Sequence, residues 1–179
     1  MSLAQLDKND LANFQFKSLH LPSDATIKKI GELQQRFSFN QIVIHPDRVT
    51  DWDKLKTSSL PLSIENMDFR KKIGKTVKEL QQFIRASKLK LTLDVNHCFS
   101  INPTMELAQE FWSVFKEHIS YFHLSGFGPN LHEPLVVTGQ KQLIDFVSGK
   151  NRPIIIESVC RNQDQATEEF NFVKNYLGL

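Results

Sequence analysis

The 179-residue sequence predicts an α/β protein in which parallel strands alternate with helices, as a compact or incomplete (β/α) barrel of about seven to eight strands. Short apolar runs alternate with segments of helical periodicity, which indicates a parallel sheet. The runs are apolar almost throughout, as expected of strands that are covered on both faces. Eight-stranded barrels usually take about 250 residues, so this barrel would be short. A doubly wound open sheet is the alternative topology.

The strand-like runs and helical segments follow one another with room for one helix between strands. In chain order the runs are FQFKSLH, QIVIHPD, LPLSIEN, LTLDVNH, ISYFHLSG and PIIIES, with a weaker seventh at 133–137. The helical segments are 26–37, 68–87, 102–118, 138–148 and 168–177. Ser23 or Asp24 can cap the first helix, and Asn102 with Pro103 suits the start of the third. The connection 48–59 is the least regular.

Composition argues against several classes of protein. Lys and Arg number 22 and Asp and Glu 20, and the resulting net charge of +2 gives no electrostatic argument for nucleic acid. No apolar run reaches the roughly 20 residues that span a bilayer, and the first ten residues lack the apolar core of a signal peptide. Cys98 and Cys160 are too few for a disulfide framework. We therefore expect a single soluble, cytoplasmic domain over residues 1–179, with no membrane partner.

Histidines and carboxylates at or just beyond the strand ends form the candidate site. The proposed metal ligands are His20, His45, Glu65, Asp94, His97, His123, His132 and Glu157. Parallel strands bring their C-terminal ends to one rim of a barrel, so we expect these residues to converge. Imidazole with carboxylate suits zinc, and manganese is the alternative for a more oxygen-rich site. Arg48, Arg70 and Arg161 follow strand ends and are candidates for phosphate binding, and Asn66 is a candidate for substrate binding.

In this order the residues resemble the motifs of the xylose-isomerase-like TIM barrel superfamily, which includes endonuclease IV and the sugar phosphate isomerases and epimerases. The resemblance extends from about His20 to Glu157, most of the chain. The matching motifs are a strand-end His-Pro (His45, Pro46), a strand-end Glu-Asn (Glu65, Asn66), an Asp-x-x-His (Asp94, His97), the strand-end His123 and a final strand-end Glu157.

The endonuclease IV-like branch implies three zinc ions at this rim. By resemblance, His20, His45 and Glu65 hold one zinc, and His97 and His132 hold the third. The second belongs to Glu65, Asp94, His123 and Glu157. Two residues before His132 that branch has an aspartate, where this sequence has Asn130.

The isomerase and epimerase branch implies one metal, held by Glu65, Asp94, His123 and Glu157. Glu65 and Glu157 would then also be the catalytic acid and base. Those enzymes commonly place an arginine shortly after the strand-end histidine, but the segment after His123 reads LSGFGPN.

Three hypotheses follow. The first is a metal-dependent isomerase or epimerase of a sugar or sugar phosphate, and the second is a polynuclear zinc phosphoester hydrolase related to endonuclease IV. The third is a degenerate barrel that binds metal or ligand without turnover. The short segments between strands and helices argue against duplex DNA and for a small substrate. A missing or reduced first strand would leave an exposed sheet edge that needs cover from the segment 3–14 or from a second subunit, so a homodimer is a secondary expectation.

Overall fold

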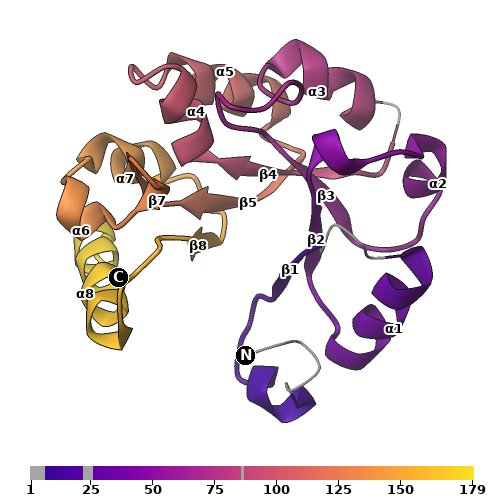
Figure 1. The fold of residues 1–179 in the computed structure, drawn as a ribbon, viewed down its shortest axis with the longest axis horizontal. Coiled ribbons are helices and arrows are strands. Elements are labelled where there is room, and N and C mark those ends of the chain that lie inside the picture. The colour runs from indigo at the N-terminus through magenta and orange to yellow at the C-terminus, as the bar shows by residue number, and fades with distance from the viewer. Residues whose placement is uncertain (1–6, 22–25, 86) are drawn as a thin grey trace.

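The computed structural model describes residues 7–21, 26–85 and 87–179, and its centre is a curled sheet of six parallel strands (Figure 1). Their order is β1 (Ser18–His20), β2 (Gln41–Ile44), β3 (Leu62–Glu65), β4 (Lys90–Asp94), β5 (Ile119–Leu124) and β8 (Ile154–Ile156). An antiparallel hairpin of β6 (Gly126–Gly128) and β7 (Leu131–Glu133) follows β5. The expected incomplete (β/α) barrel is confirmed, with six parallel strands in the described residues rather than seven or eight.

Helices cover the outer, convex side of the sheet and line its two ends (Figure 1). The α-helices are α1 (Ile27–Phe37), α2 (Trp52–Lys56), α3 (Val77–Ile84), α4 (Val95–Ile101), α5 (Glu106–Phe115), α6 (Leu135–Thr138), α7 (Lys141–Val147) and α8 (Gln163–Leu177). Two 3-10 turns, η1 (Lys8–Leu11) and η2 (Pro46–Arg48), complete the described elements. In the part of the chain that the structure describes, no helix has the length and apolar character needed to cross a membrane.

Several predicted boundaries change. The segment 68–87 is helical only from Val77, so residues 68–76 form a loop at the rim, and Thr76 caps α3 with a capping box. The weak strand predicted at 133–137 is wrong, because this region is the end of β7 followed by α6. Thr26 caps α1 by accepting a hydrogen bond from the amide of Lys29. The alternative caps, Ser23 and Asp24, lie outside the described residues.

Successive strand residues alternate between an apolar outer face and an inner face that is mostly polar, with Val43 and Ile155 as inward apolar residues. The outward residues pack in the main core against the helices, among them Ile42, Ile44, Leu62, Ile64, Leu91, Leu93, Phe122 and Leu124. Inward residues include Ser63 and Thr92, whose hydroxyl oxygens lie 2.7 Å apart. Each strand therefore carries a two-residue repeat, and the inward residue at its C-terminal end lies on the concave rim.

A β-bulge sets the phase of β5. Leu91 pairs with Ile119 but Thr92 pairs with Tyr121, so Ser120 is an extra residue on β5. A one-residue shift of register moves every later side chain to the opposite face of a sheet. Because of the bulge, Tyr121 and His123 both face the concave side, in register with Thr92 and Asp94.

The curl of the sheet is held from inside. The Tyr121 hydroxyl lies 2.5 Å from Ser18 Oγ, which joins β5 to β1 across the concave face. In the described residues β1 pairs with β2 alone and β8 with β5 alone, so no hydrogen-bonded ladder closes the barrel. The incomplete barrel thus holds its curvature partly through side chains in its interior.

A buried carboxylate fastens α8 to the C-terminal side of the rim. Glu169, which is 1% exposed, accepts hydrogen bonds from the amides of Leu135 and Val136 at 2.9 Å. Its Oε1 also lies 2.5 Å from the hydroxyl of Ser158, the residue after Glu157. Glu169 therefore stabilises the start of α6 and the segment that carries a candidate ligand.

We expect Glu169→Ala to lower the free energy of unfolding by about 2–3 kcal/mol, because two backbone amides and a hydroxyl lose a charged acceptor. Chemical denaturation measures this loss. Glu168→Ala, which removes the exposed neighbouring carboxylate on the same helix, is the control and should change stability by less than about 0.5 kcal/mol. Equal effects of the two substitutions would contradict this role for Glu169.

Candidate metal centre

Glu65 is the centre of the first group of candidate ligands. It ends β3, is 1% exposed, and contacts three imidazoles. Its Oε2 lies 2.9 Å from His45 Nε2 and 3.3 Å from His20 Nε2, while its Oε1 lies 2.8 Å from His123 Nδ1. The two oxygens of one buried carboxylate thus face imidazoles from three other strands or strand ends.

One nitrogen of His123 faces three carboxylates. Besides Glu65, the Nδ1 atom lies 3.2 Å from Glu157 Oε2 and 4.0 Å from Asp94 Oδ2. His20 approaches from the far edge of the sheet, with Nδ1 3.5 Å from Glu157 Oε1. A single N–H can satisfy one of these acceptors well, so three converging carboxylates indicate a place for a cation.

The charges on these groups are strongly coupled. Burial alone would lower the pKa of His123, but Glu65, Glu157 and Asp94 raise it to about 9. Burial also opposes the ionisation of Glu65, yet the charge and hydrogen bond of His123, with hydrogen bonds from His20 and His45, hold its pKa well below the usual range. Removal from water, reinforced by the neighbouring carboxylates, raises the pKa of Glu157 to about 7.

A second group lies beside the first and consists of Asp94, His97 and His132. Their candidate ligand atoms lie within 4.8 Å of one another, as do those of the first group, His20, Glu65, His123 and Glu157. His97 Nε2 is 3.5 Å from Asp94 Oδ2, and the rings of His97 and His132 are 5.2 Å apart. Asp94 Oδ2 is buried and accepts no hydrogen bond from the described residues. Imidazole nitrogens around an unsatisfied carboxylate oxygen are a donor set that fits a divalent cation.

Neighbouring groups orient the second cluster. His97 Nδ1 lies 2.7 Å from the carbonyl oxygen of Asn66, which leaves Nε2 facing Asp94. His132 Nδ1 lies 2.9 Å from the hydroxyl of Ser125. Hydrogen bonds of this kind fix the ring and tautomer of histidines that bind metals. No sequence pattern indicates this role for Ser125, because its partner comes from a hairpin that was not predicted.

Asn66 is placed differently from the prediction. It is buried, its side-chain nitrogen donates to the carbonyl of Asp94 at 2.9 Å, and its side-chain oxygen accepts from the amide of Asp94 at 2.7 Å. The amide therefore joins β3 to β4 and has no free edge for a substrate. These contacts position Asp94 and His97, and the substrate-binding role of Asn66 stays a prediction.

The remaining predicted residues lie outside both groups. Arg48, in η2, and Arg161, between β8 and α8, are exposed, and their phosphate-binding roles stay predictions. Asn130 donates to Glu133 Oε1 at 2.7 Å within the hairpin. The second group thus assembles without Asn130. The ligand roles of the eight histidines and carboxylates likewise stay predictions, although the structure brings them together.

No protein-family model and no curated protein matches the sequence. Solved structures do match. Endonuclease IV from Thermus thermophilus superposes with a TM-score of 0.69 at 16% identity, covering 90% of this chain and 75% of that one. A xylose isomerase domain containing protein from Salmonella typhimurium superposes with a TM-score of 0.57 at 14% identity, covering 98% of this chain and 82% of that one.

The chain has an incomplete TIM barrel fold, similar to those of endonuclease IV and of the xylose isomerase domain containing protein. Both comparisons cover nine-tenths or more of this chain. Identities of 14–16% establish the fold alone. Within this barrel, the chemistry of the rim rests on the geometry described above.

Metal binding should release protons. Because the pKa of His123 is about 9 without metal, its imidazole is protonated at pH 7.5 and must lose its proton to become a ligand. We expect apparent zinc affinity to rise with pH by about tenfold per unit for each proton released, and to level off above pH 9. Calorimetry in buffers of different ionisation enthalpy measures the proton count.

His118→Ala is the matched control, since this histidine follows α5 away from both groups. It should release as many protons as the unmodified protein, whereas His123→Ala should release fewer. Zinc affinity that is constant between pH 7 and 9 would show that His123 is not a ligand.

Proposed function

We propose that the protein is a divalent-metal-dependent hydrolase of small phosphate esters, with more than one metal at its rim. The observation that carries this proposal is the position of Glu65. Its Oε2 faces His20 and His45, and its Oε1 faces His123. A carboxylate so placed is suited to bridge two metal sites, and a single site built from His20, Glu65, His123 and Glu157 would leave His45 without a function there.

The residues divide into the two sides of Glu65. His20 and His45 are suited to hold one metal with Glu65 Oε2, while His123, Asp94 and Glu157 surround its other oxygen. When bound, a pair of metals about 3.5–4 Å apart supplies an activated water and neutralises charge on the oxygens of a phosphate ester. Glu157 is the most exposed carboxylate of this set, with its side chain 22% exposed. It is therefore the carboxylate best placed to contact an arriving substrate.

Ligand chemistry supports zinc. Five of the eight candidate ligands are imidazoles: His20, His45, His97, His123 and His132. Imidazole suits zinc, whereas manganese favours carboxylate, carbonyl and water. A mononuclear sugar isomerase is the second candidate, because Glu65, Asp94 and Glu157 gather around His123 without help from His20 or His45.

Two short connections at the rim support a small substrate. α4 begins at the residue after Asp94, and β6 begins two residues after β5 ends. Long loops that grip a duplex have no counterpart in these connections. This favours a phosphate ester of modest size over duplex DNA.

The direct test is hydrolysis of bis(4-nitrophenyl) phosphate and 4-nitrophenyl phosphate by the zinc-loaded protein, with metal content measured by elemental analysis. We expect at least two zinc ions per chain, and Glu65→Gln should lower kcat by on the order of a hundredfold or more, because the amide is a poor bridge. Glu110→Gln, an exposed substitution on α5, is the control and should leave both quantities unchanged.

His45→Ala separates the two candidate functions. A polynuclear hydrolase should lose one zinc and most of its phosphoesterase activity. A mononuclear isomerase should keep its single ion, because Glu65, Asp94, His123 and Glu157 are intact. One metal per unmodified chain, with no hydrolysis of either ester, would overturn the proposal.

A further inference from the structure

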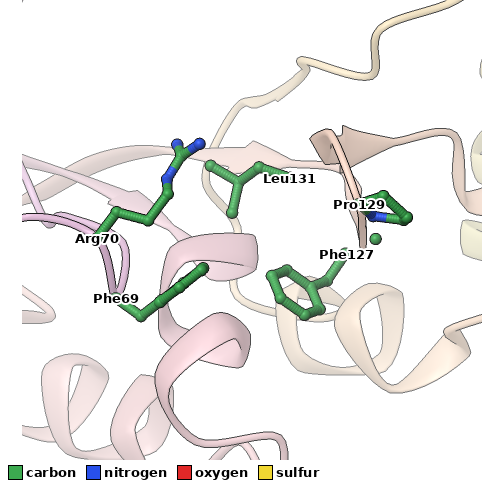
Figure 2. Close-up of a pocket in the computed structure, with 6 residues that line it drawn as sticks. Phe69, Arg70, Phe127, Pro129 and Leu131 are labelled. Carbon is green, nitrogen blue, oxygen red and sulfur yellow. The ribbon is translucent and has the colours of Figure 1, made fainter.

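We propose that a cavity beside the second histidine group binds the base of a nucleotide. Nucleotides would then be the phosphate esters that reach the rim. This inference rests on the proposed function, because it names the substrate class of the same rim. The cavity has a volume of about 550 Å³ and lies between the loop after β3 and the β6–β7 hairpin (Figure 2). It is lined by Phe69, Arg70, Phe127, Gly128, Pro129 and Leu131.

Two aromatic rings face this cavity. Phe69 is 52% exposed, and its ring centre lies 6.3 Å from that of Phe127, which itself packs 5.9 Å from Phe99. Figure 2 shows the two side chains directed toward the same space from the loop and from the hairpin. Partly exposed aromatic rings are platforms on which a nucleic acid base stacks, by about 1–3 kcal/mol per base.

Arg70 supplies a guanidinium held in one orientation by an ion pair with Asp68. Its Nε donates to Asp68 Oδ1 at 2.7 Å and its Nη2 donates to Asp68 Oδ2 at 3.2 Å, and Asp68 is 2% exposed. The guanidinium is thus fixed at the cavity wall, where it can also meet an anion. Arg is suited to phosphate oxygens, so the cavity wall offers a phosphate contact next to two aromatic faces.

The loop that carries Phe69 and Arg70 is built to hold its shape. The amide of Met67 donates to the carbonyl of Gly74 at 2.8 Å and closes the loop. Gly74 has φ +86, and a Cβ there would lie 2.5 Å from Pro46 Cγ. Only glycine fits this position without displacement of neighbouring atoms. The platform is therefore preorganised, which lowers the entropic cost of ligand binding.

The cavity adjoins the candidate metal ligands. Leu131 lines it and directly precedes His132, with a left-handed φ of 69 that is uncommon for leucine. Asn96, the neighbour of His97, donates to the Leu131 carbonyl at 2.9 Å and holds this strained residue in place. Strain held by surrounding structure is typical of functional sites. A ligand in the cavity is therefore one residue along the chain from a candidate metal ligand.

The combination favours a nucleotide over a bare sugar phosphate. A sugar phosphate would use Arg70 and leave the half-exposed ring of Phe69 uncovered. A nucleotide uses both kinds of surface, because its base can stack on an aromatic ring and its phosphate can bind Arg70. The cavity volume lies within the roughly 300–1,000 Å³ of ordinary small-molecule sites.

Binding is tested with two phosphonates in which carbon replaces the bridging ester oxygen, so that neither can be hydrolysed: the analogues of adenosine 5'-monophosphate and of ribose 5-phosphate. Calorimetry on the zinc-loaded and on the chelator-treated protein gives both dissociation constants. We expect the adenosine compound to bind at least about fivefold more tightly, in keeping with one stacked base. The comparison is independent of turnover and of zinc uptake.

Variants locate the effect. Phe69→Leu and Phe127→Leu keep apolar volume but remove a ring, and each should abolish most of the preference for the adenosine compound without weakening the ribose compound. Arg70→Lys should weaken both. Phe170→Leu on α8, which is 56% exposed in the unmodified protein, is the control and should change neither.

Equal affinity for the two phosphonates, or no binding of either by folded protein, would overturn the nucleotide inference. So would a preference that survives Phe69→Leu, a substitution at an exposed loop position that should not impair folding. A preference for the adenosine compound in a protein with no phosphoesterase activity would support base binding in this cavity while rejecting the proposed hydrolysis. Hydrolysis without a preference for the adenosine compound would support the proposed function while rejecting the nucleotide inference.

Discussion

Buried negative charge is the constraint on which the rest of this structure depends. Glu65, Asp94 and Glu157 meet around one histidine, and the first two are 1% and 0% exposed. Carboxylates withdrawn from water are unfavourable unless cations or hydrogen-bond donors compensate them. Without metal, the imidazoles of His20, His45 and His123 supply that compensation, which explains why the pKa of His123 is raised to about 9. Metal binding would exchange the proton of His123 for divalent charge.

The fold supplies this concentration of charge through ordinary sheet geometry. Each strand turns one set of residues toward the helices and the other toward the concave face, so every strand end can offer one inward ligand. The bulge at Ser120 keeps His123 in that inward set, and the Tyr121 to Ser18 contact draws β1 toward β5. As a result His20 on one edge strand and Glu157 beyond the other lie 3.5 Å apart, although β1 and β8 share no ladder.

The sequence predicts the structure best where its periodicity and spacing are strong. The strand-end placement of His20, Glu65, Asp94 and His123 follows from short apolar runs and predicts the rim without knowledge of the curl. The hairpin was missed because Gly126–Gly128 and Leu131–Glu133 are too short to show a strand period. The burial of Asn66 could not be predicted from the sequence, because it depends on packing between β3 and β4. Phe69 lies in a segment that the sequence predicts as helix. In the structure the positive φ of Gly74 and the Thr76 cap place the start of the helix at Val77, so Phe69 lies in a loop.

The most direct test of a shared Glu65 is anomalous diffraction at the zinc edge from crystals of the zinc-loaded protein. The account predicts at least two separate peaks, two of them within coordination distance of opposite oxygens of Glu65, with His20 and His45 at one and His123 at the other. A single peak surrounded by Glu65, Asp94, His123 and Glu157, with His45 hydrogen-bonded to water or substrate, would contradict the polynuclear centre and favour sugar isomerisation.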